Sequence, residues 1–264
     1  MIFETFNGFC IYHYEEVSNT NRAALHLIDE KKISTEIVII ADKQTDGRGR
    51  DQKSWISPKG NFYASLIINL MYNNFDFIPT FYSRIELCND RINLSKLTEL
   101  TFVTSIAIGD TLSLFIDKSK IQYKWPNDIL VDNKKISGIL LKKKSNSSCL
   151  VIGIGININH APLLEATCIS RYGRSVSNMD LLKELILNFN KLRKQWTFKG
   201  FSPIREMWLK RGFKINEQIS IKLAGKLYDG IFIDIDQSGR LVLKQKNGSL
   251  IYFHAGELFI NSVL

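Results

Sequence analysis

The stretch Ile37-Val38-Ile39-Ile40-Ala41-Asp42-Lys43-Gln44-Thr45-Asp46-Gly47-Arg48-Gly49-Arg50 passes from a run of branched apolar residues into a polar loop rich in glycine and arginine. The apolar run predicts a buried β-strand. The loop extends to about Gly60, and a second strand is expected at Phe62–Asn69. A connection of this length inside a compact domain is usually functional, so we expect the loop to take part in the protein's activity.

The residue types of this loop suit a small anionic ligand. Gly47 and Gly49 let the backbone approach a ligand closely, while Arg48 and Arg50 supply planar, permanently charged groups that match phosphate or carboxylate oxygens. Trp55 could cap an apolar cavity. The spacing matches neither a Walker A loop nor a dinucleotide-binding fingerprint. A solvated basic turn and an RNA-binding Gly-Arg segment both stay open on the loop alone.

Four further segments place polar residues at the ends of predicted elements. Ser18–Asn21 precedes an apolar helix and would cap it, which also creates an anion-friendly helix N-terminus. Lys124 ends a strand just before the turn Pro126–Asp128, where it points either to solvent or toward an anion. Lys135–Leu140 follows. Gly153–Asn159 combines two glycines, which allow close approach of backbone or ligand, with asparagines that either form a turn or bond a nucleotide.

The remaining pattern predicts an α+β fold. Helices are expected from Ser95 to Leu114, from Asp180 to Trp196 and over Pro203–Lys210, and strands at Phe9–Tyr14, Ile121–Trp125, Ile129–Val131, Lys135–Leu141 and Leu150–Asn159. From about Ile215, short alternating strands separated by glycine-bearing turns predict a small all-β unit. We therefore expect a mixed sheet packed with helices over residues 1–212 and a small β domain over residues 213–264. Tyr72–Leu94 gives no clear pattern.

The composition is that of an ordinary globular protein. Of the 264 residues, 45% are hydrophobic and 23% are charged, and the net charge is +9. A basic balance suits nucleic acid, an acidic membrane surface or an acidic protein, and charge alone does not choose among them. The four cysteines, Cys10, Cys88, Cys149 and Cys168, have no zinc-like spacing, so no protein metal site is expected. Neither a secretory signal nor a transmembrane segment is recognisable, which predicts a cytoplasmic protein.

Taken in order, these segments resemble the biotin–protein ligases, the enzymes that attach biotin to carboxylase carrier domains. The motifs are the Gly-Arg-Gly-Arg loop with Trp and Ser-Pro-x-Gly-Asn, Lys-Trp-Pro-Asn-Asp, Lys-x-x-Gly-Ile-Leu and Gly-x-Gly-Ile-Asn, and the resemblance runs from about Tyr14 to the end. It implies a catalytic domain like that of class II synthetases, followed by a small C-terminal β-barrel. It also implies that ATP activates biotin as biotinoyl-5′-AMP, which is transferred to a lysine of a biotin carboxyl carrier protein.

The resemblance assigns roles to individual positions. Biotin would be bound by Asn19, Thr20, Asn21, Gln44, Gly47, Arg48, Gly49, Arg50, Lys124 and Gly138. ATP would be bound by Arg48, Arg50, Trp55, Lys124, Asn127, Lys135 and Asn157. The catalytic residues would be Arg48, Arg50 and Lys124, with Mg²⁺ on the ATP phosphates. The implied partner is the carrier domain of a biotin-dependent carboxylase. Nucleic acid and membrane are not expected as partners, and the enzyme would be a monomer or a homodimer.

Three segments depart from the family pattern. Ser18-Asn19 stands where the family has Asp-Ser, whose serine hydroxyl would bond biotin, Gln52 and Lys53 replace a glycine and an arginine, and Leu141-Lys142 replaces Val-Glu. Two other functions stay open. A lipoate or octanoate ligase of the same superfamily would lack the Gly-Arg-Gly-Arg loop, and a nucleic-acid-binding module is suggested by charge and Gly-Arg alone. Because the first predicted strand begins within about ten residues of Met1, we expect no N-terminal helix-turn-helix.

Overall fold

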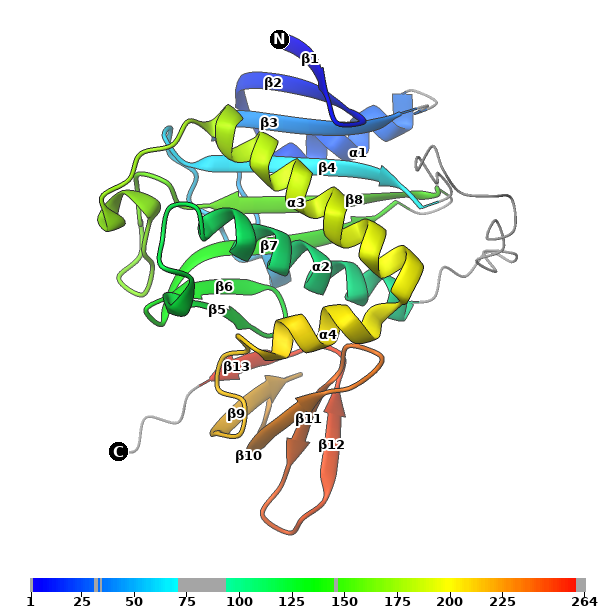
Figure 1. The fold of residues 1–264 in the computed structure, drawn as a ribbon, viewed down its shortest axis with the longest axis vertical. Helices are drawn as coiled ribbons and strands as arrows, with labels where there is room; N and C mark the ends of the chain where they lie inside the picture. The colour runs from blue at the N-terminus through cyan, green and yellow to red at the C-terminus, as the bar shows by residue number, and fades with distance from the viewer. Residues whose placement is uncertain (1, 31–32, 34, 71–93, 145–146, 260–264) are drawn as a thin grey trace. The chain divides into compact units, whose positions relative to one another are not determined.

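The structure is a computed structural model that describes residues 2–30, 33, 35–70, 94–144 and 147–259 (Figure 1). The helices are α1 (Thr20–Glu30), α2 (Leu94–Leu112), α3 (Asn178–Lys199) and α4 (Phe201–Leu209). The strands are β1 (Ile2–Phe6), β2 (Phe9–Val17), β3 (Glu36–Gln44), β4 (Phe62–Asn69), β5 (Ile121–Lys124), β6 (Asp128–Val131), β7 (Lys134–Lys143), β8 (Cys149–Ile156), β9 (Gln218–Leu223), β10 (Lys226–Ile235), β11 (Leu241–Lys244), β12 (Leu250–Phe253) and β13 (Glu257–Phe259). The unassigned stretch Tyr72–Leu94 lies outside the described residues, apart from Leu94.

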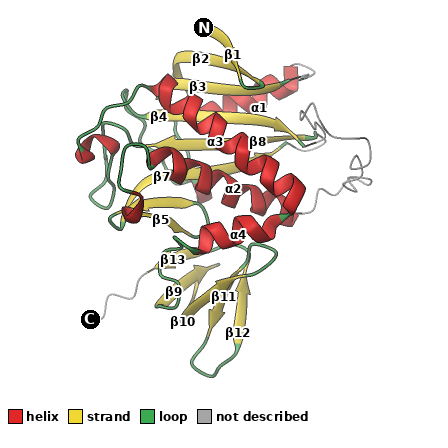
Figure 2. Ribbon diagram, viewed as in Figure 1, coloured by secondary structure: helices red, strands yellow, loops and turns green. Residues whose placement is uncertain are grey.

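The chain divides into two compact units, each of which is described by itself. Unit 1 is Met1–Leu94 with Ser137–Lys183, and unit 2 is Ser95–Ile136 with Glu184–Leu264. Eight strands form a mixed sheet in the order β1-β2-β3-β4-β8-β7-β6-β5, and five form an antiparallel sheet in the order β12-β11-β10-β9-β13. Together with the helices (Figure 2), these sheets confirm the predicted α+β class. The domain boundary between residues 212 and 213 stays a prediction.

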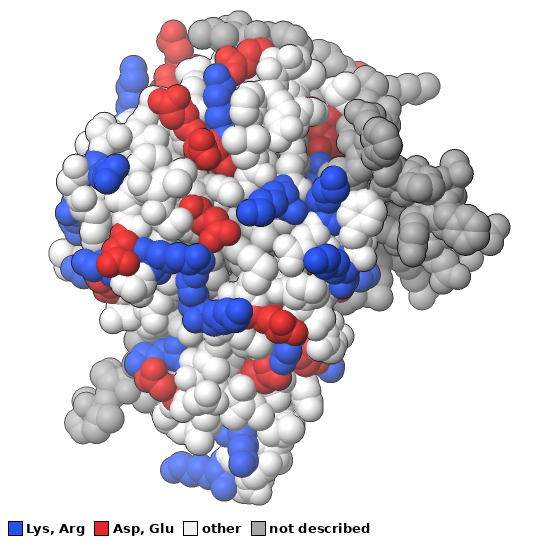
Figure 3. Space-filling view, in the orientation of Figure 1, with Lys and Arg blue, Asp and Glu red and all other residues white. Residues whose placement is uncertain are grey.

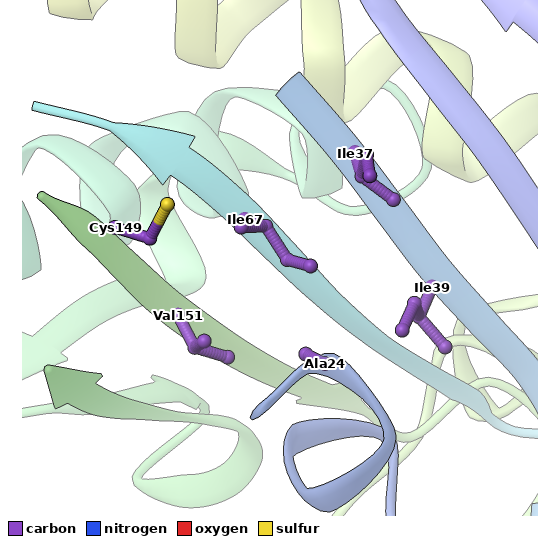
Figure 4. Packing of buried hydrophobic residues seen from close by; sticks show 6 residues of the cluster. All are labelled: Ala24, Ile37, Ile39, Ile67, Cys149 and Val151. Atoms are coloured by element: carbon purple, nitrogen blue, oxygen red, sulfur yellow. The ribbon is translucent and has the colours of Figure 1, made fainter. Parts of the chain in front are cut away.

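The sequence of unit 1 places the start of α1 beside the end of β3. β2 and β3 are parallel, so the chain between them must cross over, and α1 makes that connection. The first six residues of β3, up to Ala41, are buried, as expected for an unbroken apolar run. α1 packs on β3, β4 and β8. Figure 4 shows the apolar cluster formed there, which comprises Ala24, Ile37, Ile39, Ile67, Cys149 and Val151. Since Val17 pairs with Gln44, the end of β2, the start of α1 and the end of β3 meet at one end of the sheet.

The strand β1 is absent from the sequence-based expectations. It pairs antiparallel with β2, from Phe6 opposite Phe9 to Ile2 opposite His13. The two residues of the connecting turn, Asn7 and Gly8, have φ of 44° and 88°. Positive φ at both positions is the geometry that Asn-Gly favours in two-residue hairpins. The first strand of the chain is therefore an edge strand closed by a tight turn.

In unit 2, the C-terminal sheet is held to helices and to the β5–β6 hairpin by specific contacts. Trp125 Nε1 donates to the main-chain oxygen of Gly239 at 3.4 Å. A Cβ on Gly239 would lie 2.9 Å from Thr98 Cγ2 of α2, so this turn touches the helix directly. Arg205 of α4 pairs with Asp234 of β10. The small C-terminal sheet therefore belongs to the same compact unit as α2 and α4. Within the described ranges, no helix has both the length and the apolar character to cross a bilayer.

Candidate functional site

The start of α1 and the start of the Gly-Arg loop are tied together by Asn19. Its Oδ1 accepts the backbone N–H of Arg22 at 3.2 Å, which caps the helix. Its Nδ2 donates to the main-chain oxygen of Asp46 at 3.1 Å. The N–H groups of Thr45 and Asp46 donate to the carbonyls of Val17 and Ser18. Asn19 thus acts as cap and loop anchor at once, and its contact with biotin stays a prediction.

A continuous line of hydrogen bonds links α1, β3, β4 and the loop. Gln44 Oε1 accepts from Thr20 N at 2.9 Å and from Thr20 Oγ1 at 3.2 Å. Gln44 Nε2 donates to Ser57 Oγ at 3.0 Å. Ser65 Oγ lies 2.8 Å from Thr20 Oγ1 and 2.6 Å from Asn21 Oδ1, both of which can accept its proton. Three of the predicted biotin residues, Thr20, Asn21 and Gln44, therefore meet in one polar cluster.

The floor beneath this cluster is made of glycines on neighbouring strands. In β8, Gly153 pairs with Ser65 and Gly155 with Tyr63, while Gly138 of β7 pairs with Gly155. A Cβ on Gly153 would lie 2.4 Å from Asn21 Oδ1. A Cβ on Gly155 would lie 2.6 Å from Trp55 Cε2. Only glycine lets the start of α1 and the indole of Trp55 lie this close to the sheet.

The loop folds back on itself as a short hairpin. Trp55 N donates to Gly47 O at 2.9 Å, and Gly49 N donates to Lys53 O at 2.7 Å. At its tip, Asp51 and Gln52 have φ of 52° and 58°. Left-handed backbone is uncommon for residues with a side chain. The tip is thus the strained part of the hairpin.

The charge of Arg48 faces an acidic neighbour. Arg48 Nη2 lies 2.6 Å from Asp46 Oδ1, and Arg22 Nη2 lies 3.0 Å from Asp46 Oδ2. The side chain of Arg48 is 45% exposed. Exposed ion pairs contribute at most about 1 kcal/mol, so an anionic ligand could exchange for the carboxylate at little cost. Arg50 begins the short 3₁₀ turn that follows and is half-buried.

The far end of the loop is fixed by two side chains, that of Asn61 just before β4 and that of Tyr63 in β4. Asn61 Oδ1 accepts three consecutive backbone N–H groups, from Ile158, Asn159 and His160, at 2.9, 3.0 and 2.9 Å. Asn61 Nδ2 donates to the main-chain oxygen of His160 at 2.8 Å. These bonds clamp the chain after β8 onto the start of β4.

Tyr63 Oη, on β4, donates to the main-chain oxygen of Pro58 at 2.8 Å. Burial raises the pKa of the Tyr63 phenol, which outweighs the lowering by Asn61 and Ser57, so this donor stays protonated.

Asn157, predicted to contact ATP, is only 3% exposed. Its Nδ2 donates to Thr167 O at 3.0 Å, and its Oδ1 lies 3.4 Å from Asn61 Nδ2. The side chain is therefore occupied by structural bonds, and a nucleotide contact there stays a prediction. The motif Ser-Pro-x-Gly-Asn contains Ser57 and Asn61, but the sequence assigned no role to either, and Ser65 lies in no motif; the contacts of all three are with distant segments.

The other predicted residues belong to unit 2. Lys124 ends β5 and pairs in register with Asp128 across the hairpin, with Asn127 in the intervening turn. Lys135 Nζ lies 2.8 Å from Asp128 Oδ1. The Lys-Trp-Pro-Asn-Asp segment therefore forms a tight hairpin turn with a paired lysine beside it. Their roles toward biotin and ATP rest on the sequence motif.

Two family models match this chain. Residues 14–159 match the Biotin/lipoate A/B protein ligase family, and residues 214–260 match the Biotin protein ligase C terminal domain. The chain is 28% identical over 254 residues to the biotin--[acetyl-CoA-carboxylase] ligase of Paracoccus denitrificans, covering 91% of this chain and 96% of that protein. It is 28% identical over 252 residues to the bifunctional ligase/repressor BirA of Bacillus subtilis, covering 90% of this chain and 70% of that protein.

Solved structures show the same fold. The biotin protein ligase from Aquifex aeolicus in complex with biotin and ATP has a TM-score of 0.74 at 22% identity, covering 94% of this chain and 97% of that one. The Leishmania major ligase in complex with biotinyl-5-AMP has a TM-score of 0.62 at 25% identity, with coverage of 93% and 98%. These matches confirm the resemblance and the enzyme class expected from the motifs. Since the first family model covers more than half of its residues, the chain belongs to the biotin/lipoate A/B protein ligase family.

Proposed function

We propose that this ligase joins biotin to ATP as biotinoyl-5′-AMP and transfers the biotinoyl group to a lysine of a biotin carboxyl carrier protein. The observation that carries the proposal is the polar cluster of Thr20, Asn21 and Gln44 above the floor of Gly153 and Gly155. Amide and hydroxyl groups suit the ureido ring of biotin, which both donates and accepts hydrogen bonds. A glycine floor next to an indole suits its flat apolar body.

Activation requires that negative charge be stabilised near the polar cluster. A carboxylate oxygen of biotin attacks the α-phosphorus of ATP, the bond to the β-phosphate oxygen breaks, and pyrophosphate leaves. Charge builds on the phosphoryl oxygens in this step, so fixed cations and N–H donors accelerate it. Arg48 and Arg50 on the loop and Lys124 in its motif are the proposed donors. The exposed Arg48–Asp46 pair supports this role, because a phosphate can replace the carboxylate.

Magnesium is proposed to arrive with the nucleotide. Among the described residues, no three His, Cys, Asp or Glu side chains gather as metal ligands. Mg²⁺ is commonly held through substrate phosphates, a few carboxylates and water, without a dedicated protein cage. When bound with ATP, it would neutralise phosphate charge alongside Arg48 and Arg50.

Transfer uses biotinoyl-AMP, which is a mixed anhydride, as the acyl donor. The unprotonated ε-amine of the carrier lysine attacks the acyl carbon of biotinoyl-AMP, an amide bond forms, and AMP leaves with the electron pair of the broken acyl–phosphate bond. The anhydride must be shielded from water until then. The loop after β3 is proposed to cover it, because its hairpin is held at both ends but half-exposed between them.

Two other functions compete with that of a biotin ligase. A lipoate ligase shares the family of residues 14–159, but the Gly-Arg-Gly-Arg loop and the match of residues 214–260 to the biotin ligase C-terminal domain favour biotin. A nucleic-acid-binding module would need cations gathered in a tract. Figure 3 instead shows lysine and arginine interspersed with acidic side chains on the face in view. The absence of a nucleic-acid partner, the choice between monomer and homodimer, and a cytoplasmic location all stay predictions.

Biotin-dependent exchange of labelled pyrophosphate into ATP tests the first half-reaction. Mass spectrometry of a carrier domain incubated with biotin and ATP tests the second. We expect Arg50→Ala and Lys124→Ala to lower exchange by about a hundredfold or more. Lys59→Ala removes an exposed cation of the same loop and serves as the matched control. Exchange that depends on lipoate and ignores biotin would overturn the proposal.

A further inference from the structure

Ser57 lies where the loop, β3 and the helix start converge, and no activity has yet been assigned to it. Its side chain is buried. Its Oγ accepts from Gln44 Nε2 at 3.0 Å and donates to Trp55 O at 2.8 Å, and it also lies beside the phenol of Tyr63. A Cβ on Gly47 would come within 2.4 Å of the same oxygen. The hydroxyl is thus packed closely against the main chain of Gly47 and Trp55.

The chemistry of these groups fixes the direction of each bond. A main-chain carbonyl can only accept, so the single proton of Ser57 goes to Trp55 O. Ser57 Oγ must then accept from Gln44, which places Nε2 toward Ser57 and Oε1 toward Thr20. The reverse orientation would set two donors, Gln44 Nε2 and Thr20 N, against each other. The orientation of the carboxamide therefore follows from its partners and not from an arbitrary assignment of its atoms.

The orientation propagates toward the ligand cluster. Because Gln44 Oε1 accepts the Thr20 hydroxyl at 3.2 Å, the lone pairs of Thr20 Oγ1 are left to accept from Ser65 at 2.8 Å. The donors run one way from Thr20 through Gln44 to Ser57 and the carbonyl of Trp55, while the proton of Ser65 can go to Thr20 Oγ1 or to Asn21 Oδ1. The hydroxyl of Ser57 therefore sets how the Gln44 carboxamide is presented to Thr20.

We infer that Ser57 is a positioning residue of the biotin site. It fixes the orientation of the Gln44 carboxamide and links that orientation to the main chain of Trp55, which pairs with Gly47 at the start of the loop. The inference about the ligand rests on the proposed function, whereas the orientation itself does not. Removing the hydroxyl with Ser57→Ala leaves a nearly isosteric side chain, frees Gln44 Nε2, and leaves Trp55 O without this donor. Binding of biotin must then also order the Gln44 carboxamide, which weakens binding. The cations proposed to stabilise charge during attack on the α-phosphorus are unchanged.

The first arm of the test uses nuclear magnetic resonance of the ligand-free protein. The side-chain amide signals of Gln44 are identified by their loss in Gln44→Ala. We expect Ser57→Ala to shift them and to speed their hydrogen exchange severalfold, whereas Ser54→Ala, which removes an exposed hydroxyl of the same loop, leaves them in place. Unchanged Gln44 signals in Ser57→Ala would overturn the inference, whatever reaction the enzyme catalyses.

The second arm is a double-mutant cycle in biotin-dependent pyrophosphate exchange. Ser57→Ala is expected to raise the KM for biotin about fivefold to tenfold, the size of one neutral hydrogen bond, with kcat and the KM for ATP changed less than about twofold. The same substitution in the Gln44→Ala background is expected to have no further effect. An equal effect in both backgrounds would overturn the inference. Absence of exchange in the wild type would count against the proposed function, and the first arm would still decide the role of Ser57.

Discussion

Alanine at Gly153 and alanine at Gly155 should have opposite consequences, although the two residues are two apart on β8. A Cβ on Gly153 would lie 2.4 Å from Asn21 Oδ1 and 2.6 Å from its Nδ2. Asn21 is buried and held by Ser65, so it cannot retreat. A Cβ on Gly155 would lie 2.6 Å from Trp55 Cε2, which belongs to a half-buried loop residue that can swing outward.

The magnitudes follow from packing and chain entropy. Overpacking a buried site costs about 1–3 kcal/mol, and replacing glycine by alanine offsets about 0.4–1 kcal/mol by restricting the unfolded chain. Gly153→Ala should therefore lower the free energy of unfolding by about 1–2 kcal/mol. Gly155→Ala should change it by less than about 0.5 kcal/mol, because movement of Trp55 relieves the overlap.

Urea unfolding followed by far-ultraviolet circular dichroism measures both free energies. Tryptophan fluorescence of the folded proteins should change in Gly155→Ala and stay near the wild type in Gly153→Ala. The KM for biotin should rise in both, since each methyl group enters the floor of the site. Equal destabilisation by the two substitutions would refute the reasoning, because it would mean that Asn21 and Trp55 yield to the same degree.

Four further outcomes are expected. Gln52→Gly should raise the free energy of unfolding by up to about 1 kcal/mol in urea titrations, because Gln52 has φ of 58°; a loss of stability would contradict this. Arg48→Ala should leave stability within about 0.5 kcal/mol, since its ion pair is exposed, yet lower pyrophosphate exchange about a hundredfold; a smaller loss would remove Arg48 from the catalytic set. Asn61→Ala should cost about 1–3 kcal/mol, because three consecutive N–H groups, of which that of Ile158 is buried, lose their acceptor; a marginal change in thermal unfolding would argue against the clamp. Burial raises the pKa of Tyr63 in the folded state. The contribution of Tyr63 to the free energy of unfolding is therefore complete below the pKa of the unfolded state, near pH 10, and is lost as the pH rises above it. Tyr63→Phe should flatten the decline of the unfolding free energy at alkaline pH, and an unchanged slope would show that Tyr63 does not cause the decline.

The elements that the sequence predicts well are those whose apolar pattern is strong and local. Ile37–Ile40 lies within β3, and the helix predicted from Asp180 to Trp196 lies within α3, Asn178–Lys199. β1 was not predicted, although Asn7-Gly8 is a hairpin signal, because only a short and weakly patterned run precedes it. The pairing of β5 with β6 was also missed, since its turn was interpreted as the end of a strand.

The residues of the candidate site likewise comprise some that the sequence identifies and some that it does not. Thr20, Asn21 and Gln44 could be chosen from motifs, and the structure brings them together through the crossover between β2 and β3. Ser57 lies in the motif Ser-Pro-x-Gly-Asn but could not be given a role from it, and Ser65 could not be chosen, because a serine in a strand has no distinguishing local pattern. Their importance comes from hydrogen bonds to residues that fold beside them from elsewhere in the chain.

The contacts of Gly239 limit how this protein can be recombined with its relatives. The turn that contains Gly239 is shaped to Thr98 and accepts a bond from Trp125, and Arg205 reaches Asp234. A chimera that imports residues 214–260 from another ligase would therefore place a foreign turn against native helix and hairpin surfaces. Successful exchange should require that residues 98, 125 and 205 be taken from the same donor as residues 214–260. The part of the chain that must be exchanged together is therefore not one contiguous stretch of sequence.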